Sequence, residues 1–125
     1  MDVESFREYC LKKAGVSEEM PFGPDNLVFK VCGKMFALNS LDTASFSVNL
    51  KCDPEYALEL RDKYSGIQPG YHMNKQHWNT VNGNEDVPDK LILELTDHSY
   101  DLVVSKLPAK IKTEYGLTNG KNCFP

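Results

Sequence analysis

The chain has 125 residues, of which 41% are hydrophobic, and its formal net charge is −4 at pH 7. This length and apolar content fit one domain with its own core, which needs no disulfide or metal to hold it together. The net negative charge is opposite to the positive charge that nucleic-acid-binding domains usually carry. No stretch approaches the roughly 18 consecutive apolar residues of a membrane helix. The acidic amino terminus also lacks the basic start and apolar run of a signal peptide, so we expect a soluble cytoplasmic protein.

The first predicted element is a helix over residues 3–14. Asp2 provides an N-cap, apolar side chains recur at helical spacing, and Gly15 follows a basic last turn as a C-terminal stop. The next predicted elements are three strands, over residues 27–32, 34–40 and 46–51. The first two strands are joined at Gly33, and because the first carries apolar side chains on both faces, we expect it to be central in its sheet.

A second helix is predicted over residues 54–64. Asp53 can cap its free amides, and Pro54 at the first helical position loses no hydrogen bond there. The segment Pro69–Val81 is then predicted to form two short strands that turn near Asn74 and Lys75.

Pro88 is predicted to open a third helix, whose wide apolar face ends before Pro108. Residues beyond Pro108 indicate a frayed, mildly basic tail. The predicted order is therefore helix, three strands, helix, two strands, helix.

The segment Pro69–Val81 has an unusual composition, because it holds two of the three histidines, the only tryptophan and one lysine, with no acidic residue. Trp78, with Tyr71, can present flat faces for stacking on nucleotide bases, or it can belong to the core. His72 and His77 can bind a metal, hydrogen-bond the turn or contact an anionic partner, although their spacing matches no familiar zinc pattern. We interpret this segment as a contact surface.

The cysteines form no C-x-x-C pair, so we expect free thiols; they are Cys10, Cys32, Cys52 and Cys123. We expect Cys123 to be the most exposed of the four. Cys52 is the best candidate nucleophile, since it precedes a helix N-terminus that can lower the pKa of a thiol. No glycine-rich phosphate loop, G-x-S-x-G, H-E-x-x-H or paired-carboxylate signature is present, so we predict that the protein is not an enzyme. His98 and Tyr100 are expected to be buried neighbours of the sheet.

Charge is divided between the predicted elements. The predicted helical stretches carry net negative charge, whereas the predicted strands and the C-terminal segment carry net positive charge. An open face of the sheet could therefore be locally positive and attract phosphate, although solvated acidic helices are common in soluble proteins.

Four strings resemble one family; they are F-K-V-C-G-K-M-F-A (29–37), N-L-K-C-D-P-E (49–55), P-G-Y-H-M-N-K-Q-H-W-N-T-V (69–81) and D-H-S-Y-D-L-V (97–103). With the order of elements, they identify the chain as similar to the MmcQ/YjbR family of small bacterial proteins. The resemblance runs over about residues 2–112. It predicts a family domain over residues 1–112 and a flexible C-terminal tail over residues 113–125.

The resemblance implies a two-layer α+β fold, α-β(3)-α-β(2)-α, with an antiparallel sheet covered by helices as in secretion-chaperone-like and CyaY-like proteins. Family members are commonly labelled DNA-binding, through two hairpin wings that reach the duplex. Carried over, one wing is the hairpin around Gly33 with Lys30 and Lys34. The other is the hairpin around Asn74, with His72, Lys75, His77 and Trp78.

The leading hypothesis is weak, non-sequence-specific nucleic-acid binding, with DNA as the expected partner and no cofactor. The expected phosphate contacts are lysines, namely Lys30, Lys34, Lys51 and Lys75. The expected tip residues are Tyr71, His72, Asn74, His77 and Trp78. The wing segments contain no arginine for bidentate reading of guanine, so sequence-specific readout is not expected.

Two alternatives remain open. The sheet face can pair with a protein partner or a second copy of the chain, which predicts an exposed apolar patch or a free strand edge. Acidic residues near the first helix can instead bind a cation in a frataxin-like way; they are Asp2, Glu4, Glu8, Glu18 and Glu19. No membrane partner is expected.

Overall fold

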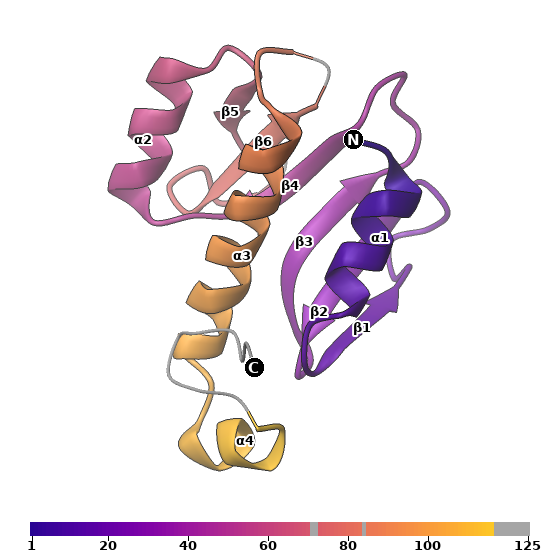
Figure 1. Cartoon of the computed structure of the whole chain (residues 1–125), viewed down its shortest axis with the longest axis vertical. Helices are drawn as coiled ribbons and strands as arrows, with labels where there is room; N and C mark the ends of the chain where they lie inside the picture. Colours follow the sequence, from indigo (N-terminus) through magenta and orange to yellow (C-terminus); the bar gives the residue numbers. More distant parts are fainter. Residues whose placement is uncertain (71–72, 84, 117–125) are drawn as a thin grey trace.

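The structure is a computed structural model that describes residues 1–70, 73–83 and 85–116. Its elements are α1 (Val3–Leu11), β1 (Val16–Glu19), β2 (Asn26–Val31), β3 (Lys34–Ser40), β4 (Ser47–Lys51), α2 (Pro54–Lys63), β5 (Ile67–Pro69), β6 (Trp78–Asn82), α3 (Asp89–Ser105) and α4 (Ala109–Glu114). The strands form one six-stranded antiparallel sheet in the order β1-β2-β3-β4-β6-β5. Figure 1 shows α1 and α3 lying across this sheet, with α2 beside β5. The predicted α+β class, with an antiparallel sheet covered by helices, is confirmed.

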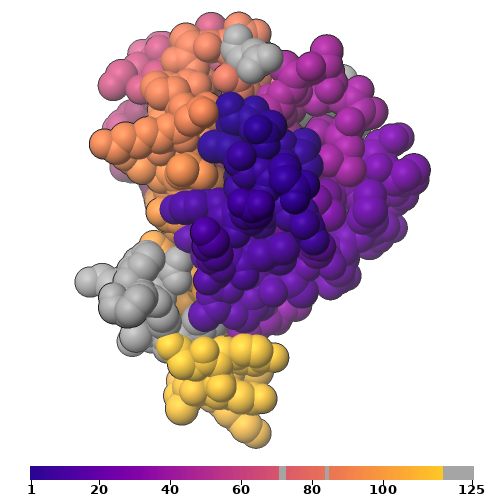
Figure 2. Space-filling view, turned by 45° about the vertical axis from the view of Figure 1, so that its right-hand side comes forward, coloured from indigo at the N-terminus to yellow at the C-terminus, as the bar shows by residue number. Residues whose placement is uncertain are grey.

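The structure has two elements that the sequence did not indicate. The four-residue strand β1 pairs with the edge of β2, and its sequence V-S-E-E lacks the apolar alternation that marks a strand. The helix α4 occupies residues 109–114, where a frayed segment was expected, and it buries none of its side chains. In the space-filling view α4 projects from one end of the molecule (Figure 2). The division of the chain at residue 112 stays a prediction.

The two helix N-caps predicted from the sequence, Asp2 and Asp53, are present in the structure. Asp2 accepts a hydrogen bond from the Ser5 amide at 2.8 Å, and Asp53 accepts one from the Tyr56 amide at 3.2 Å. Each bond satisfies one of the amides that the first turn of a helix leaves free. The β2–β3 hairpin turns through two residues with positive φ, Cys32 at 49° and Gly33 at 83°, which suits a tight two-residue hairpin loop.

The hydrophobic core lies between the sheet and the two helices α1 and α3. Phe6 of α1 is fully buried and packs on Phe29 and Phe46, with ring centroids 5.7 and 5.2 Å apart. Phe36 of β3 makes an edge contact with Tyr100 of α3 at 5.4 Å. The central position predicted for β2 agrees with its pairing to β1 and β3. No helix in the described part of the chain has the length and apolar character required to cross a membrane.

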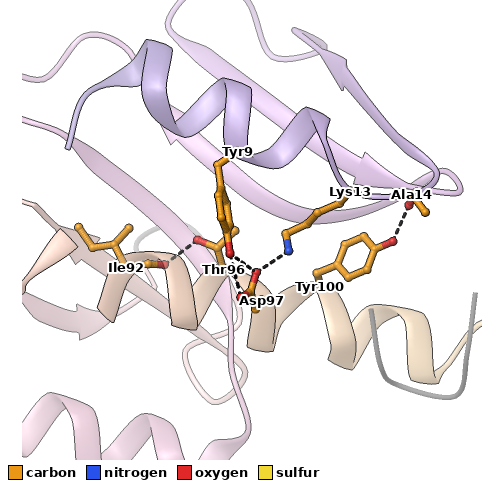
Figure 3. Close-up of polar contacts among 7 residues, drawn as sticks. All are labelled: Tyr9, Lys13, Ala14, Ile92, Thr96, Asp97 and Tyr100. Atoms are coloured by element: carbon orange, nitrogen blue, oxygen red, sulfur yellow. Dashed lines mark hydrogen bonds and ion pairs between the residues drawn. The ribbon is translucent and has the colours of Figure 1, made fainter. Parts of the chain in front are cut away.

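An ion pair joins the residues just after α1 to α3 (Figure 3). The Lys13 ammonium bonds Asp97, and its side chain is only 6% exposed. The Tyr9 hydroxyl donates to the Asp97 carboxylate at 2.8 Å, and burial together with this carboxylate raises the pKa of Tyr9. The Tyr100 hydroxyl donates to the carbonyl of Ala14 just after α1. Because a buried charge requires a partner, these contacts fix how the two helices sit against each other.

A second polar contact joins α3 to the sheet. The register of β3 and β4 ends at the pair Ala37 and Leu50, so Phe36 and Lys51 would form the next pair. Instead, the Ser99 hydroxyl accepts from the Lys51 amide at 2.9 Å and donates to the Phe36 carbonyl at 2.6 Å. The Ser99 side chain thus replaces a direct backbone hydrogen bond between the two strands. It lies between the start of β3 and the end of β4.

We expect Ser99→Ala to lower the free energy of unfolding by about 1–3 kcal/mol, because Ser99 is fully buried and its loss leaves an amide and a carbonyl without a partner. Urea denaturation followed by circular dichroism measures this change. Ser105→Ala is the matched control, since the hydroxyl of that exposed serine on the same helix bonds only the Leu102 carbonyl, and a loss within about 0.5 kcal/mol is expected there. Equal losses in the two variants would contradict the bridging role.

Candidate functional site

Three lysines from three elements line one pocket at the end of the sheet where β3 begins and β4 ends. Lys34 opens β3, Lys51 ends β4, and Lys106 is the C-cap residue of α3. The pocket has a volume of about 370 Å³, and its other described lining residues are apolar, namely Met35, Val103, Leu107 and Pro108. We call it the basic pocket. No described lining residue is acidic.

The electrostatics of the basic pocket favour an anion. Burial, with the neighbouring charge of Lys106 as a further cause, lowers the pKa of Lys51. Partial burial and a neighbouring like charge both disfavour the charged form of a lysine. A bound anion would remove this penalty, so the basic pocket is suited to a phosphate or a carboxylate. Sequence reasoning selected Lys34 and Lys51 but missed Lys106, which only the packing of α3 brings to them.

The other two predicted phosphate lysines lie elsewhere. Lys30 on β2 forms an ion pair with Glu19 of β1, with 3.1 Å between Nζ and Oε1, so its charge is already partnered. Lys75 is exposed on the loop between β5 and β6, beside a separate cleft of about 250 Å³ that Arg61 also lines. The four lysines therefore do not form one continuous surface.

The β5–β6 connection is a tightly held turn. The Asn74 side chain accepts from the Gln76 amide at 2.9 Å, and the Asn74 carbonyl accepts from the amides of His77 and Trp78 at 3.2 and 2.9 Å. The His77 carbonyl accepts from the Cys52 amide at 2.7 Å. Trp78 is half-buried and lies outside the main core cluster. Tyr71 and His72, the other predicted tip residues, lie outside the described residues.

Arg61 of α2 holds this turn from one side, a role that the sequence did not indicate. Its Nε donates to Asn79 Oδ1 at 2.7 Å, and its Nη2 donates to the carbonyls of Lys75 and Trp78. On the other side of the turn, Gly70 lies close against Trp78. A Cβ atom at Gly70 would be 2.7 Å from the Cβ of Trp78, so no side chain fits at this position. Much of the unusual string 69–81 is therefore explained by the construction of the turn.

The sheet face opposite α1 and α3 bears a wide groove, which we call the open-face groove. Its volume is about 710 Å³. Four of its lining residues carry carboxamides (Asn26, Asn49, Gln68 and Asn82) and four carry hydroxyls (Ser40, Thr43, Ser47 and Thr80). The others are apolar, namely Phe22, Met35, Leu38, Pro69 and Met73. The described lining has no charged side chain, so the groove itself does not supply the locally positive surface that an open face of the sheet could carry.

The candidate nucleophile is unsuited to catalysis. Cys52 is 3% exposed, and burial raises the pKa of its thiol to about 12 instead of lowering it. The helix N-terminus does not compensate, since the loss of solvation dominates. The expectation of free thiols is confirmed for Cys10, Cys32 and Cys52, while Cys123 lies outside the described residues.

Most of the acidic residues proposed for a cation have other partners. Glu18 forms an ion pair with Arg7, with 2.6 Å between Oε2 and Nε, and this pair lowers the pKa of Glu18. Asp2 caps α1, and Glu19 pairs with Lys30. Across residues 1–70, 73–83 and 85–116, no group of three or more His, Cys, Asp or Glu side chains is arranged to hold a metal ion.

His98 of α3 contacts the start of α2. Its Nε2 accepts from the Asp53 amide at 3.2 Å, and its ring makes an edge contact with Tyr56 at 5.3 Å. Burial lowers the pKa of His98. The neutral ring is therefore the form that the fold uses, because only a deprotonated nitrogen accepts a hydrogen bond. Tyr100 is buried against Phe36 of β3, as predicted, whereas His98 is half-buried and its contacts are to the start of α2.

Comparison with known proteins gives a consistent result. The family model described as YjbR matches residues 11–102. The uncharacterized protein YbdF of Escherichia coli O157:H7 is 44% identical over 104 residues, which cover 83% of this chain and 85% of that protein. The uncharacterized protein YjbR of Escherichia coli K12 is 33% identical over 108 residues, or 86% of this chain and 92% of that protein.

Solved structures agree with the sequence matches. A crystal structure of a Deinococcus radiodurans protein has a TM-score of 0.88 at 37% identity, and the match covers 94% of this chain and 89% of that one. A crystal structure of a Pseudomonas syringae protein has a TM-score of 0.71 at 34% identity, with 82% and 98% covered. These relatives leave the ligand to be argued from the geometry of the site.

We expect NMR titration of His98 to give a midpoint below the ordinary value of 6.5, because burial penalises the charged ring. The unfolded state then binds the proton more tightly than the folded state. The contribution of His98 to the free energy of unfolding is therefore complete above about pH 6.5 and is lost as the pH falls from there through the folded pKa. A midpoint at or above 6.5 would show that the ring is not held in its neutral form.

Proposed function

This chain belongs to the YjbR family, and we propose that it binds nucleic acid weakly and without sequence specificity, through phosphate contacts at the basic pocket. One observation carries the proposal: Lys34, Lys51 and Lys106 converge from three elements on a pocket with no acidic residue in its described lining. Lysine ammonium groups act as point charges toward phosphate and do not read base edges in the way that bidentate arginine does.

The number of lysines in the basic pocket sets the expected affinity for nucleic acid and its dependence on salt. Each phosphate neutralised on a single strand contributes about −0.7 to the slope of log affinity against log salt, so three contacts give a slope of about −2. The rest of the chain opposes binding through its net charge of −4. Weak, strongly salt-dependent association is the consequence.

We propose binding instead of catalysis. The thiol of Cys52, the best candidate nucleophile in the sequence, is buried and has a raised pKa. The basic pocket holds lysines and apolar side chains among its described residues, without a carboxylate or an imidazole to act as a base beside them. Such a set is suited to holding an anion.

We expect Lys51→Gln to weaken binding to a fluorescein-labelled oligonucleotide and to reduce the magnitude of the salt slope by about 0.7, because one phosphate contact is lost. Fluorescence anisotropy over a salt series starting at about 50 mM measures both quantities. Lys106→Gln should behave in the same way, and it changes an exposed side chain with little risk to folding.

The matched control is Lys30→Gln, which removes the same charge at a lysine that is paired with Glu19 outside the pocket. Its affinity and salt slope should stay close to those of the unchanged protein. Equal weakening in all three variants would show that only net charge matters. If the unchanged protein binds neither duplex nor single-stranded DNA or RNA, the proposed function is wrong.

A second candidate function is self-association through the edge of the sheet at β1. The outer side of β1 has no partner strand within the described sheet, and the loop after β1 exposes Met20 by 47% and Phe22 by 63%. An unpaired strand edge beside exposed apolar side chains favours pairing with a second copy.

We expect sedimentation equilibrium to detect a dimer if this second function holds, and Phe22→Ser to shift the population to monomer by removing buried apolar area from the interface. Leu58→Ser is the matched control, since Leu58 is also 63% exposed but lies on α2. A protein that is monomeric at all accessible concentrations would exclude the dimer.

A further inference from the structure

The open-face groove has the chemistry of a site for a neutral, planar ligand. Its volume of about 710 Å³ lies within the range of roughly 300–1,000 Å³ that is usual for ligand sites. Carboxamides both donate and accept hydrogen bonds, and hydroxyls do the same. The described lining offers no charge to attract an ion into the groove itself. The natural ligand is therefore one that presents donors and acceptors together at the edge of a flat apolar face.

Asn49 on the floor of the groove supports this assignment. It is only 6% exposed, and its Oδ1 accepts from the Thr80 hydroxyl at 2.6 Å, which orients its amide. Among the described residues no acceptor is found for its Nδ2, and this nitrogen is not one of the buried side-chain atoms that lack a partner, so it is accessible from the groove. This donor is therefore open to an acceptor on a ligand in the groove.

The groove adjoins the basic pocket. Met35 at the start of β3 lines both, so a ligand can contact the two sites at once. A nucleotide has this combination of parts, with a phosphate and a neutral planar base whose edge carries donors and acceptors. Met35, Leu38 and Phe22 offer apolar surface to the face of the base.

We infer that the open-face groove binds unpaired nucleobases, so that the preferred nucleic acid is single-stranded. The inference rests on the proposed function, because the basic pocket is required to hold the phosphates. In a duplex the base edges are paired and the faces stacked, and a base must leave the stack before it can enter the groove. Lining by amides and hydroxyls, which can donate or accept, suits any base and agrees with binding that does not depend on sequence.

The test compares three probes of one length, namely oligothymidylate, an abasic oligodeoxynucleotide and a duplex. The abasic strand keeps every phosphate but has no base, so it measures the basic pocket alone. We expect oligothymidylate to bind about tenfold more tightly than the abasic strand and more tightly than the duplex, as measured by anisotropy. The side-chain amide signals of Asn26, Asn49, Gln68 and Asn82 in ¹⁵N NMR spectra should shift with oligothymidylate and stay in place with the abasic strand.

A variant separates the groove from the basic pocket. Gln68 is exposed at the rim on β5, so Gln68→Ala should leave folding intact, lower the affinity for oligothymidylate about threefold and leave that for the abasic strand unchanged. Gln76→Ala, at an exposed glutamine outside the groove, is the matched control and should change neither affinity.

The outcomes distinguish this inference from the proposed function. Equal binding of oligothymidylate and the abasic strand, without movement of the amide signals, overturns the groove assignment and leaves phosphate-led binding in place. Tighter binding of the duplex than of the single strand also overturns the assignment. Failure of all three probes to bind overturns the proposed function and the groove assignment together.

Discussion

The site depends on one serine placed between two strands. Ser99 of α3 replaces a rung between β3 and β4 by bonding Phe36 and Lys51, and it is fully buried. An antiparallel pair would otherwise close at this point with direct backbone hydrogen bonds. Because the hydroxyl occupies that position, the strand ends that carry Lys34 and Lys51 are held apart. Lys106, seven residues further on, is the C-cap of the same helix, so α3 both bridges the two strands and supplies the third cation of the basic pocket.

The distribution of charge follows from the same packing. Several acidic residues form structural ion pairs, such as Asp97 of α3 with Lys13 and Glu18 of β1 with Arg7 of α1. These pairs hold α1 against α3 and α1 against β1, where a buried or half-buried charge must have a partner. At the end of α3, no described residue that lines the basic pocket is acidic. An acidic protein can therefore keep one local site for anions, since a nearby unpaired cation acts more strongly than distant screened charges.

The string that most clearly identifies the family has a structural explanation. Gly70 admits no side chain beside Trp78, and the Asn74 side chain and carbonyl bond the turn. Arg61 closes the turn from α2, at a distance in sequence that no local motif reveals. Pro69 and Met73 of this segment line the open-face groove. Recognition of a family by such a string therefore identifies the fold and locates the groove, without itself naming the ligand.

Local chemistry in the sequence was enough to predict the N-caps at Asp2 and Asp53, the central strand β2 and the α+β class, because each depends on neighbouring residues or on simple apolar periodicity. The strand β1 was missed since its four residues carry no periodic signal, and it forms only because β2 offers an edge. The basic pocket was half predicted: Lys34 and Lys51 were selected from strand position, but Lys106 reached them only through the docking of α3. The pKa of Cys52 was predicted in the wrong direction, because its helix-start position is visible in the sequence while its burial is not. Contacts between near neighbours are determined by the sequence alone, whereas solvation and the meeting of distant side chains are decided only when the layers pack.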